Sequence, residues 1–139
     1  MTADAIPQRI RIGAYGVVIE ADKMLLCHLT RSGRWTLPGG GLDFGEAPEA
    51  GMRREVLEET GMVVEPDRVL GVHSFTKHGP DEDFQSIQIV YSTILVGGML
   101  RQELDGTTDD CAWVPIAGIL DMDIVPLVGV TLSNFMQLL

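Results

Sequence analysis

Three consecutive glycines, Gly39-Gly40-Gly41, precede a segment of helical composition, and this junction constrains the fold more than any other part of the sequence. Pro48 suits the first turn of a helix, and Gly61 suits the position just past its end. The sequence therefore predicts a helix over residues 48–60. We expect the glycines to form a loop outside regular structure, because glycine reaches backbone angles closed to other residues and lets the main chain approach a ligand closely.

The predicted helix carries an acidic stripe. Glu55, Glu58 and Glu59 fall within roughly 100° of one another at helical periodicity. Such a stripe is either a solvated face whose charge is neutralised by Arg53 or Arg54, or a binding site for a divalent cation. Runs of charged residues on helices are usually solvated faces. The glycine loop favours the latter, because glycine loops and aligned carboxylates both serve phosphate and its counter-ion. Carboxylate oxygens suit Mg²⁺, with Mn²⁺ as a possible substitute.

The rest of the chain reads as strands with one more helix. The predicted strands cover residues 10–20, 24–30, 35–37, 63–76, 86–96 and 111–115, and the first two are expected to pair as a hairpin. A polar loop is expected over residues 77–84 and a closing helix over residues 125–139. Several strands with two separated helices predict an α/β or α+β layered fold.

Composition narrows the class of ligand. The chain has 139 residues, the length of one ordinary domain, and a formal net charge of −10. This charge disfavours nucleic acid polymers and anionic membranes as partners. A phosphate-bearing ligand would need local cations, and Arg31 and Arg34, just before the glycines, are candidates for substrate binding. Cys27 and Cys111 form no metal motif or disulfide framework. We see no signal-peptide core and no membrane-length apolar run, so a cytoplasmic protein is expected.

The segment from Gly40 to Met62 resembles the Nudix box of the Nudix (MutT-like) hydrolase family. Every defined position of that pattern is present: Gly40, Glu46, Arg54-Glu55-Val56, Glu58-Glu59 and Gly61-Met62. The resemblance implies a single Nudix hydrolase domain over residues 1–139, folded as an α/β/α sandwich with a mixed β-sheet between helices. It also implies Mg²⁺-dependent hydrolysis of a phosphoanhydride bond in a nucleoside diphosphate linked to another moiety, X.

The resemblance also implies roles for single residues. The metal ligands would be Glu55, Glu58 and Glu59, with a backbone carbonyl near Gly39 or Gly40, and Glu58 or Glu59 could relay a proton. Arg54 would hold a neighbouring glutamate in place, and Glu46 would support the junction of loop and helix, with Arg54 as its candidate partner. The remaining glycines of the box support its structure: Gly39, Gly41 and Gly61.

Several alternatives stay open. An additional loop acid could assist as a base, and the candidates are Asp81, Glu82, Asp83, Glu103, Asp105, Asp109 and Asp110. The short chain favours a small nucleoside triphosphate as substrate, whereas ADP-ribose or a nucleotide sugar is the alternative; Pro80 lies roughly where ADP-ribose-cleaving relatives carry a proline. A non-catalytic regulatory module of the same fold is disfavoured by the intact box. Relatives commonly dimerise, so a homodimer is possible.

Overall fold

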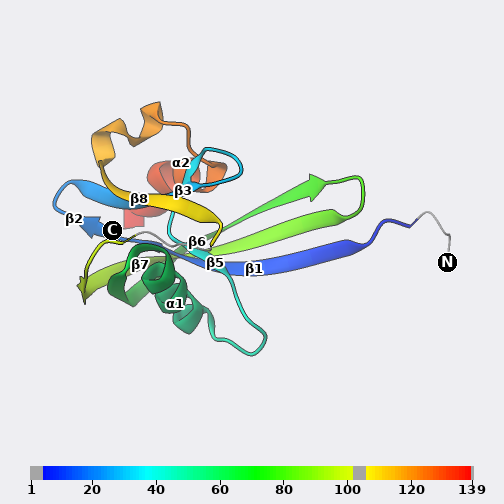
Figure 1. Ribbon diagram of the computed structural model, residues 1–139, viewed down its shortest axis with the longest axis horizontal. Coiled ribbons are helices and arrows are strands. Elements are labelled where there is room, and N and C mark those ends of the chain that lie inside the picture. Colours follow the sequence, from blue (N-terminus) through cyan, green and yellow to red (C-terminus); the bar gives the residue numbers. More distant parts are fainter. Residues whose placement is uncertain (1–4, 102–105, 139) are drawn as a thin grey trace.

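The computed structural model describes residues 5–101 and 106–138. Helices lie on both sides of a mixed β-sheet, with α1 on one side and α2 on the other (Figure 1). The expected fold class, a mixed sheet between helices, is confirmed. No helix in this part of the chain is long and apolar enough to cross a membrane.

The first sheet of the described residues has the strand order β5-β1-β7-β6. Its members are β1 (Gln8–Val17), β5 (Gly39–Gly41), β6 (Met62–His78) and β7 (Asp83–Gly98). Strands β1 and β7 are parallel, whereas β5 and β6 are antiparallel to their neighbours. Alternate residues of β1 therefore face opposite sides of this sheet, one toward α1 and one toward the pocket described below.

The second sheet contains β3 (Lys23–Leu29), which pairs with each of the other three strands: β2 (Ile19–Glu20), β4 (Trp35–Thr36) and β8 (Thr108–Pro115). The expected hairpin between the first two strands is therefore present only at its turn, where Ile19–Glu20 pairs with Lys23 and Met24, and is wrong for the rest of the first strand. Only β2 pairs with β3, because the chain passes from the first sheet to the second near Val18, and β1 pairs instead with β5 and β7.

The predicted helix over residues 48–60 is confirmed as α1 (Pro48–Thr60), and Gly61 ends it in the left-handed conformation at φ 79°. The prediction that Gly39-Gly40-Gly41 lies outside regular structure is wrong, because these residues form β5 against β1. Side chains would not fit there: a Cβ on Gly39 would lie 2.4 Å from the Ala14 carbonyl oxygen, and one on Gly41 would lie 2.2 Å from Arg11 Nε.

Two other boundaries differ from expectation. The polar loop predicted over residues 77–84 is shorter, since cross-strand pairing of β6 and β7 continues to His78 and Asp83. The closing helix is divided into α2 (Pro126–Val130), a π-helical turn η2 (Thr131–Phe135) and a 3₁₀ turn η3 (Met136–Leu138). A further 3₁₀ turn, η1 (Ile116–Asp121), follows β8.

The core lies on both sides of the first sheet. On the α1 side, Met52 and Val56 pack with Ala14, and a Cβ on Gly16 would lie 3.1 Å from the sulfur of Met52. On the other side, Leu127 and Val128 of α2 pack among residues of both sheets. The closing helical segment thus covers the sheet opposite α1, and it forms one wall of the space between the sheets.

Close packing of η2 on β6 predicts an effect of Gly71→Ala. A Cβ there would lie 2.4 Å from the Phe135 ring, so the ring must move. We expect the substitution to lower the free energy of unfolding by roughly 1–3 kcal/mol, measured by urea denaturation. The matched control is Gly97→Ala, since a Cβ on Gly97 of β7 meets nothing within 4 Å. Equal stabilities of the two variants would contradict this account of the packing.

Candidate active site

The acidic face of α1 lies directly against the glycine strand β5. The Gly39 N–H donates to Oε2 of Glu59 at 3.2 Å, and the Glu59 side chain is buried. A Cβ on Gly40 would lie 2.9 Å from the carboxyl carbon of Glu55. Two carboxylates of the helix therefore lie against the main chain of β5. Glycine is needed at position 40, because a side chain there would collide with the carboxylate of Glu55.

Arg54 lies among the carboxylates of the same region. Its Nε and Nη2 atoms donate to the two oxygens of Glu46 at 2.7 and 2.9 Å, a bidentate pair. Its Nη1 donates to Glu55 at 3.0 Å and to Glu58 at 3.2 Å, and Nη2 also donates to the Gly41 carbonyl at 3.3 Å. One guanidinium thus joins the loop, the glycine strand and the acidic stripe, and it offsets the repulsion along that stripe.

These contacts shift the pKa values of both partners. The hydrogen bond from Arg54, helped by the backbone N–H of Asp43, lowers the pKa of Glu46 to about 2. The hydrogen bond to Glu46 raises the pKa of Arg54. Both groups are therefore charged at every pH at which the protein would work, and the pair remains fixed.

The chemistry of the donors fits a hard divalent cation. Glu55 and Glu59 offer carboxylate oxygens beside the backbone of Gly39 and Gly40. Glu58 is half exposed, and releasing it from Arg54 would cost little, because exposed ion pairs are weak. As the side chains now stand, no group of three His, Cys, Asp or Glu residues in the described part of the chain is arranged to hold a metal ion.

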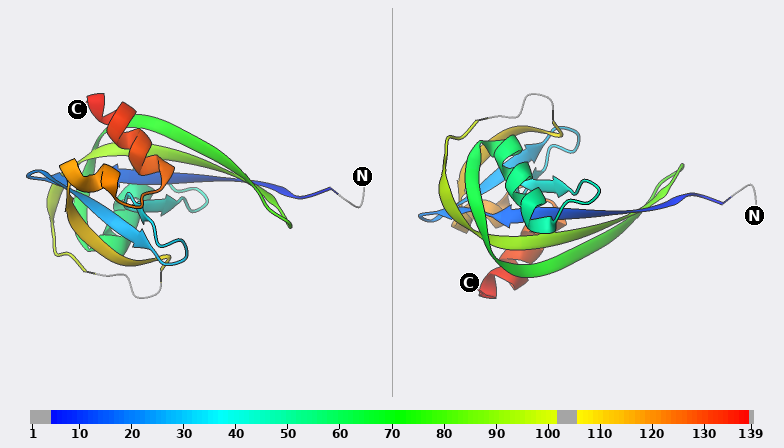
Figure 2. Two further views of the ribbon diagram at one scale, coloured as in Figure 1. Left: turned by 90° about the horizontal axis from the view of Figure 1, so that it is seen from above. Right: turned by 90° about the horizontal axis from the view of Figure 1, so that it is seen from below.

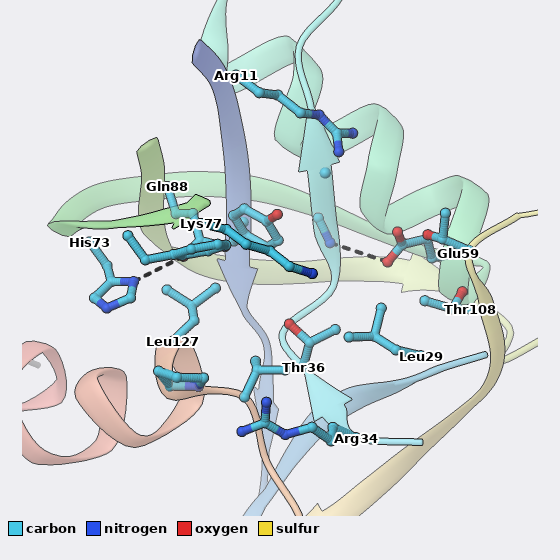
Figure 3. Close-up of a pocket in the computed structure, with 17 residues that line it drawn as sticks. Arg11, Leu29, Arg34, Thr36, Glu59, His73, Lys77, Gln88, Thr108 and Leu127 are labelled. Atoms are coloured by element: carbon cyan, nitrogen blue, oxygen red, sulfur yellow. Dashed lines mark hydrogen bonds between the residues drawn. The ribbon is translucent and has the colours of Figure 1, made fainter. Parts of the chain in front are cut away.

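A pocket of about 550 Å³ opens beside Glu59. It lies between the face of the first sheet that is turned away from α1, the strands β3 and β4, and the start of α2. Glu59 and Thr108 lie on one side, and His73 and Gln88 lie on the opposite side (Figure 3). The lining also includes Arg11, Tyr15, Leu29, Arg34, Thr36, Gly39, Gly40, Phe75, Lys77, Thr107, Val125, Pro126 and Leu127.

Positive charge gathers at this pocket although the chain is acidic. Arg11, Arg34 and Lys77 line it, and Glu59 is the one acidic residue among the described lining residues. Arg34 donates to the Ile124 carbonyl at 2.9 Å, which anchors it near the start of α2. Within the described residues, the ion pairs include neither Arg11 nor Lys77, so both charges are available to an anionic ligand.

Of the two arginines singled out from the sequence, the structure brings only Arg34 to the pocket. Arg31 is exposed and is not among the described lining residues. Sequence reasoning missed Arg11, His73 and Lys77, which come from strands far apart in the chain. The sequence could have pointed to these residues only through the alternation of side chains along a β-strand. This alternation shows which residues share a face of the sheet, but it does not show which face carries the site.

None of the candidate loop acids that the structure describes is among the residues that line the pocket. The structure describes five of them, and their contacts are Glu82 with Arg9, Asp83 with His78, Asp109 with His28, and Asp110 with the Cys111 N–H, while Asp81 is exposed. Glu103 and Asp105 lie outside the described residues. The hydrogen bond that the His28 imidazole donates to Asp109, at 2.6 Å, raises the pKa of His28. Asp109 is therefore engaged as the partner of an imidazole.

The chain is similar in sequence to known proteins. The model of the NUDIX domain matches residues 9–130. A MutT-like protein of Streptomyces ambofaciens is 36% identical over 97 residues, which are 69% of this chain and 59% of that protein. An ADP-ribose pyrophosphatase of Methanocaldococcus jannaschii is 34% identical over 62% of this chain and 52% of its own length.

An 8-oxo-dGDP phosphatase of Homo sapiens is 31% identical over 78% of this chain and 35% of its own length. The chain thus matches less than two thirds of the length of each of these three relatives. Among solved structures, the MutT protein of Methanosarcina mazei Go1 superposes with a TM-score of 0.78 at 24% identity, over 96% of this chain and 97% of that one. This likeness supports the fold.

The pairing of Glu46 with Arg54 predicts a pH dependence of stability. Because the folded pKa of about 2 lies below the ordinary 4.5, ionised Glu46 favours the folded state. That contribution is complete above about pH 4.5 and is lost as the pH falls toward 2. We expect Glu46→Gln to be less stable than the unsubstituted protein near neutrality, and the difference to shrink below pH 4.5.

Urea denaturation at a series of pH values between 6 and about 3 would measure this difference. Glu20→Gln is the control, since it removes an exposed carboxylate of β2. Parallel pH profiles for Glu46→Gln and the unsubstituted protein would contradict the assignment, as would an equal change in Glu20→Gln.

Proposed function

Because the chain belongs to the Nudix family of hydrolases, we propose that it hydrolyses a phosphoanhydride bond of a small nucleotide in the pocket beside Glu59. One observation carries the proposal: Glu59 of the acidic stripe and the backbone of Gly39 and Gly40 line a pocket that is also lined by Arg11 and Lys77, two cations that the ion pairs of the described residues do not include. The carboxylates suit a cation, and the cationic side chains suit the phosphates.

We propose that Glu55, Glu58 and Glu59, with the Gly40 carbonyl, hold Mg²⁺, for which Mn²⁺ could substitute. When bound, the ion would neutralise phosphate charge and promote attack by water. Arg54 orients the glutamates through its contacts with Glu55 and Glu58 and does not contact the substrate.

The remaining steps fall to residues that meet the substrate. Glu59 lines the pocket, and the Gly39 N–H holds one of its oxygens, which fixes the carboxylate against β5. Glu59 or Glu58 would accept the proton from the attacking water. Arg11 and Lys77 would bind the phosphate oxygens, and Arg34 would bind either a phosphate or the nucleoside.

For the substrate we favour a nucleoside triphosphate, oxidised or not, over ADP-ribose or a nucleotide sugar. The relatives carry names from both classes, namely 8-oxo-dGDP phosphatase and ADP-ribose pyrophosphatase. A pocket of about 550 Å³ is the size of an ordinary small-molecule site, so it suits a single nucleotide. We further propose that the chain acts as one domain in the cytoplasm. Light scattering would test whether it forms a homodimer.

A substrate panel tests this proposal directly. Nucleoside triphosphates, 8-oxo-dGTP, ADP-ribose and nucleotide sugars would be incubated with Mg²⁺ or with EDTA, and released phosphate and nucleotide would be measured. We expect cleavage of at least one class with Mg²⁺ and none with EDTA. Cleavage that persists in EDTA would contradict the metal assignment, and no cleavage by folded protein would contradict the nucleotide assignment.

Glu58→Gln tests the acidic stripe. Since Glu58 is half exposed, we expect the variant to fold normally, as checked by circular dichroism and thermal unfolding. We expect its kcat to fall by about a hundredfold or more, the scale of a lost proton-transfer group. The matched control is Glu49→Gln, in the first turn of the same helix but outside the stripe. Normal turnover in Glu58→Gln would contradict the role proposed for this residue.

A further inference from the structure

The fold places the two cysteines of the chain directly opposite each other. Cys27 lies on β3 and Cys111 lies on β8, and the two residues are partners in the antiparallel pairing of these strands. The strands run side by side in the left view of Figure 2, where they are drawn in blue and gold. Neither cysteine is among the described residues that line the pocket, so the reaction proposed above does not use them.

The two cysteines form the closer of the two kinds of pair that alternate along antiparallel strands. The N–H and C=O groups of one residue point to the same edge of its strand, and successive residues point to opposite edges. The Leu25 N–H donates to the Val18 carbonyl, on the edge of β3 that is turned away from β8. Cys27 comes two residues later and points its backbone groups to that same edge. No backbone hydrogen bonds therefore join Cys27 to Cys111.

This geometry suits a disulfide bond. In a pair without backbone hydrogen bonds the Cα atoms lie about 4.5 Å apart, and the side chains lie on one face of the sheet. Disulfides join cysteines whose Cα atoms are about 4.4 to 6.8 Å apart. Both side chains belong to one buried cluster, together with Met52 and Val56 of α1. A bond between the two sulfur atoms therefore requires no change in the register of the strands.

Cys111 is the member of the pair that lies nearer to solvent. It is 7% exposed, whereas Cys27 is 0% exposed. Among the described strands, β8 pairs with β3 alone, so Cys111 lies on an edge strand. Its thiol donates to the backbone carbonyl of Arg101, an exposed residue, at 3.3 Å. Local opening of an edge costs less free energy than global unfolding, and it would give a small oxidant access to this sulfur.

We propose that Cys27 and Cys111 form a reversible disulfide when the protein meets a peroxide. The Cys111 thiolate attacks one oxygen of hydrogen peroxide, the O–O bond breaks, and a sulfenic acid forms as hydroxide leaves. The Cys27 sulfur then attacks the Cys111 sulfur, and the hydroxyl group leaves with the Cys27 proton as water. In total, two thiols and one hydrogen peroxide give one disulfide and two waters. Two molecules of a small thiol reverse the reaction by exchange.

The opposed partner distinguishes this pair from two inert buried thiols. Burial raises the pKa of Cys111, and the negative charges of Asp110 and Glu59 raise it further, so the reactive thiolate is scarce near neutral pH. The first step is therefore slow, and it becomes faster as the pH rises. A sulfenic acid formed on Cys111 meets the Cys27 thiol at once, so the disulfide forms in preference to higher oxidation states of sulfur.

The disulfide would hold the fold together in an oxidising environment. Residues 27 and 111 enclose α1, β6 and β7 within one loop of the chain. A crosslink across a long loop restricts the unfolded chain strongly, and this raises the stability of the folded state when the native geometry is not strained. We therefore expect the oxidised protein to melt at a higher temperature than the reduced protein.

The experiment oxidises the reduced protein with hydrogen peroxide at about pH 8, where more of the thiol is ionised. The protein is then denatured, and its remaining thiols are alkylated. The chain has two cysteines, so an intramolecular disulfide can only be this one. We expect peptide mass spectrometry to find the two cysteine peptides linked and not alkylated, and dithiothreitol to restore both thiols. We expect the melting temperature to rise by about 5 °C or more on oxidation.

Cys111→Ser is the matched control, because a serine hydroxyl can still donate to the Arg101 carbonyl. The variant should melt near the reduced protein, and peroxide should not raise its melting temperature. Two alkylated cysteines after peroxide would overturn the proposal. Separate oxidation of the cysteines to sulfinic acid, a disulfide between two molecules, or an equal rise in Cys111→Ser would also overturn it. No part of this test depends on turnover, so its result is independent of the proposed function.

Discussion

The five hydrogen bonds of Arg54 are the interaction on which the rest of the site depends. The three glutamates on one face of the helix repel one another, and the burial of Glu59 raises the energetic cost of this repulsion. The Arg54 guanidinium offsets this charge locally and also reaches Glu46 and the Gly41 carbonyl. One planar group with fixed donors thus joins helix, loop and strand, and it helps to hold Glu55 and Glu58 in place near β5.

Glycine makes the other half of this arrangement possible. The helix can approach β5 closely only because Gly40 has no side chain at the place where Glu55 lies. Gly39 takes a φ of 151°, and Tyr15 lies where its Cβ would be. The backbone of β5 therefore lies directly against the carboxylates of Glu55 and Glu59, and its polar groups belong to the candidate site.

The sequence predicted the helix α1 and its acidic stripe better than the part of the candidate site that lies on the sheet. Helical spacing and a proline and glycine at the two ends were enough to define α1 and its acidic stripe, since these signals are local. The glycine strand was missed, because it pairs with residues 13–15 of β1, which lie far from it in the sequence. Arg11, His73 and Lys77 were missed for the same reason, since strands meet only through the register of β1, β6 and β7.

The distribution of charge connects the two halves of the site. Most acidic residues in the described part of the chain are exposed to solvent, whereas Glu46, Glu55 and Glu58 contact Arg54, which offsets part of the acidic charge near the pocket. Strands β1 and β6 place Arg11 and Lys77 in the lining of the pocket, and α1 places Glu59 there. A phosphate chain in this pocket would meet the positive charges of Arg11 and Lys77, and a cation held by the carboxylates of α1 would add to them. In this way an acidic protein can attract an anionic substrate.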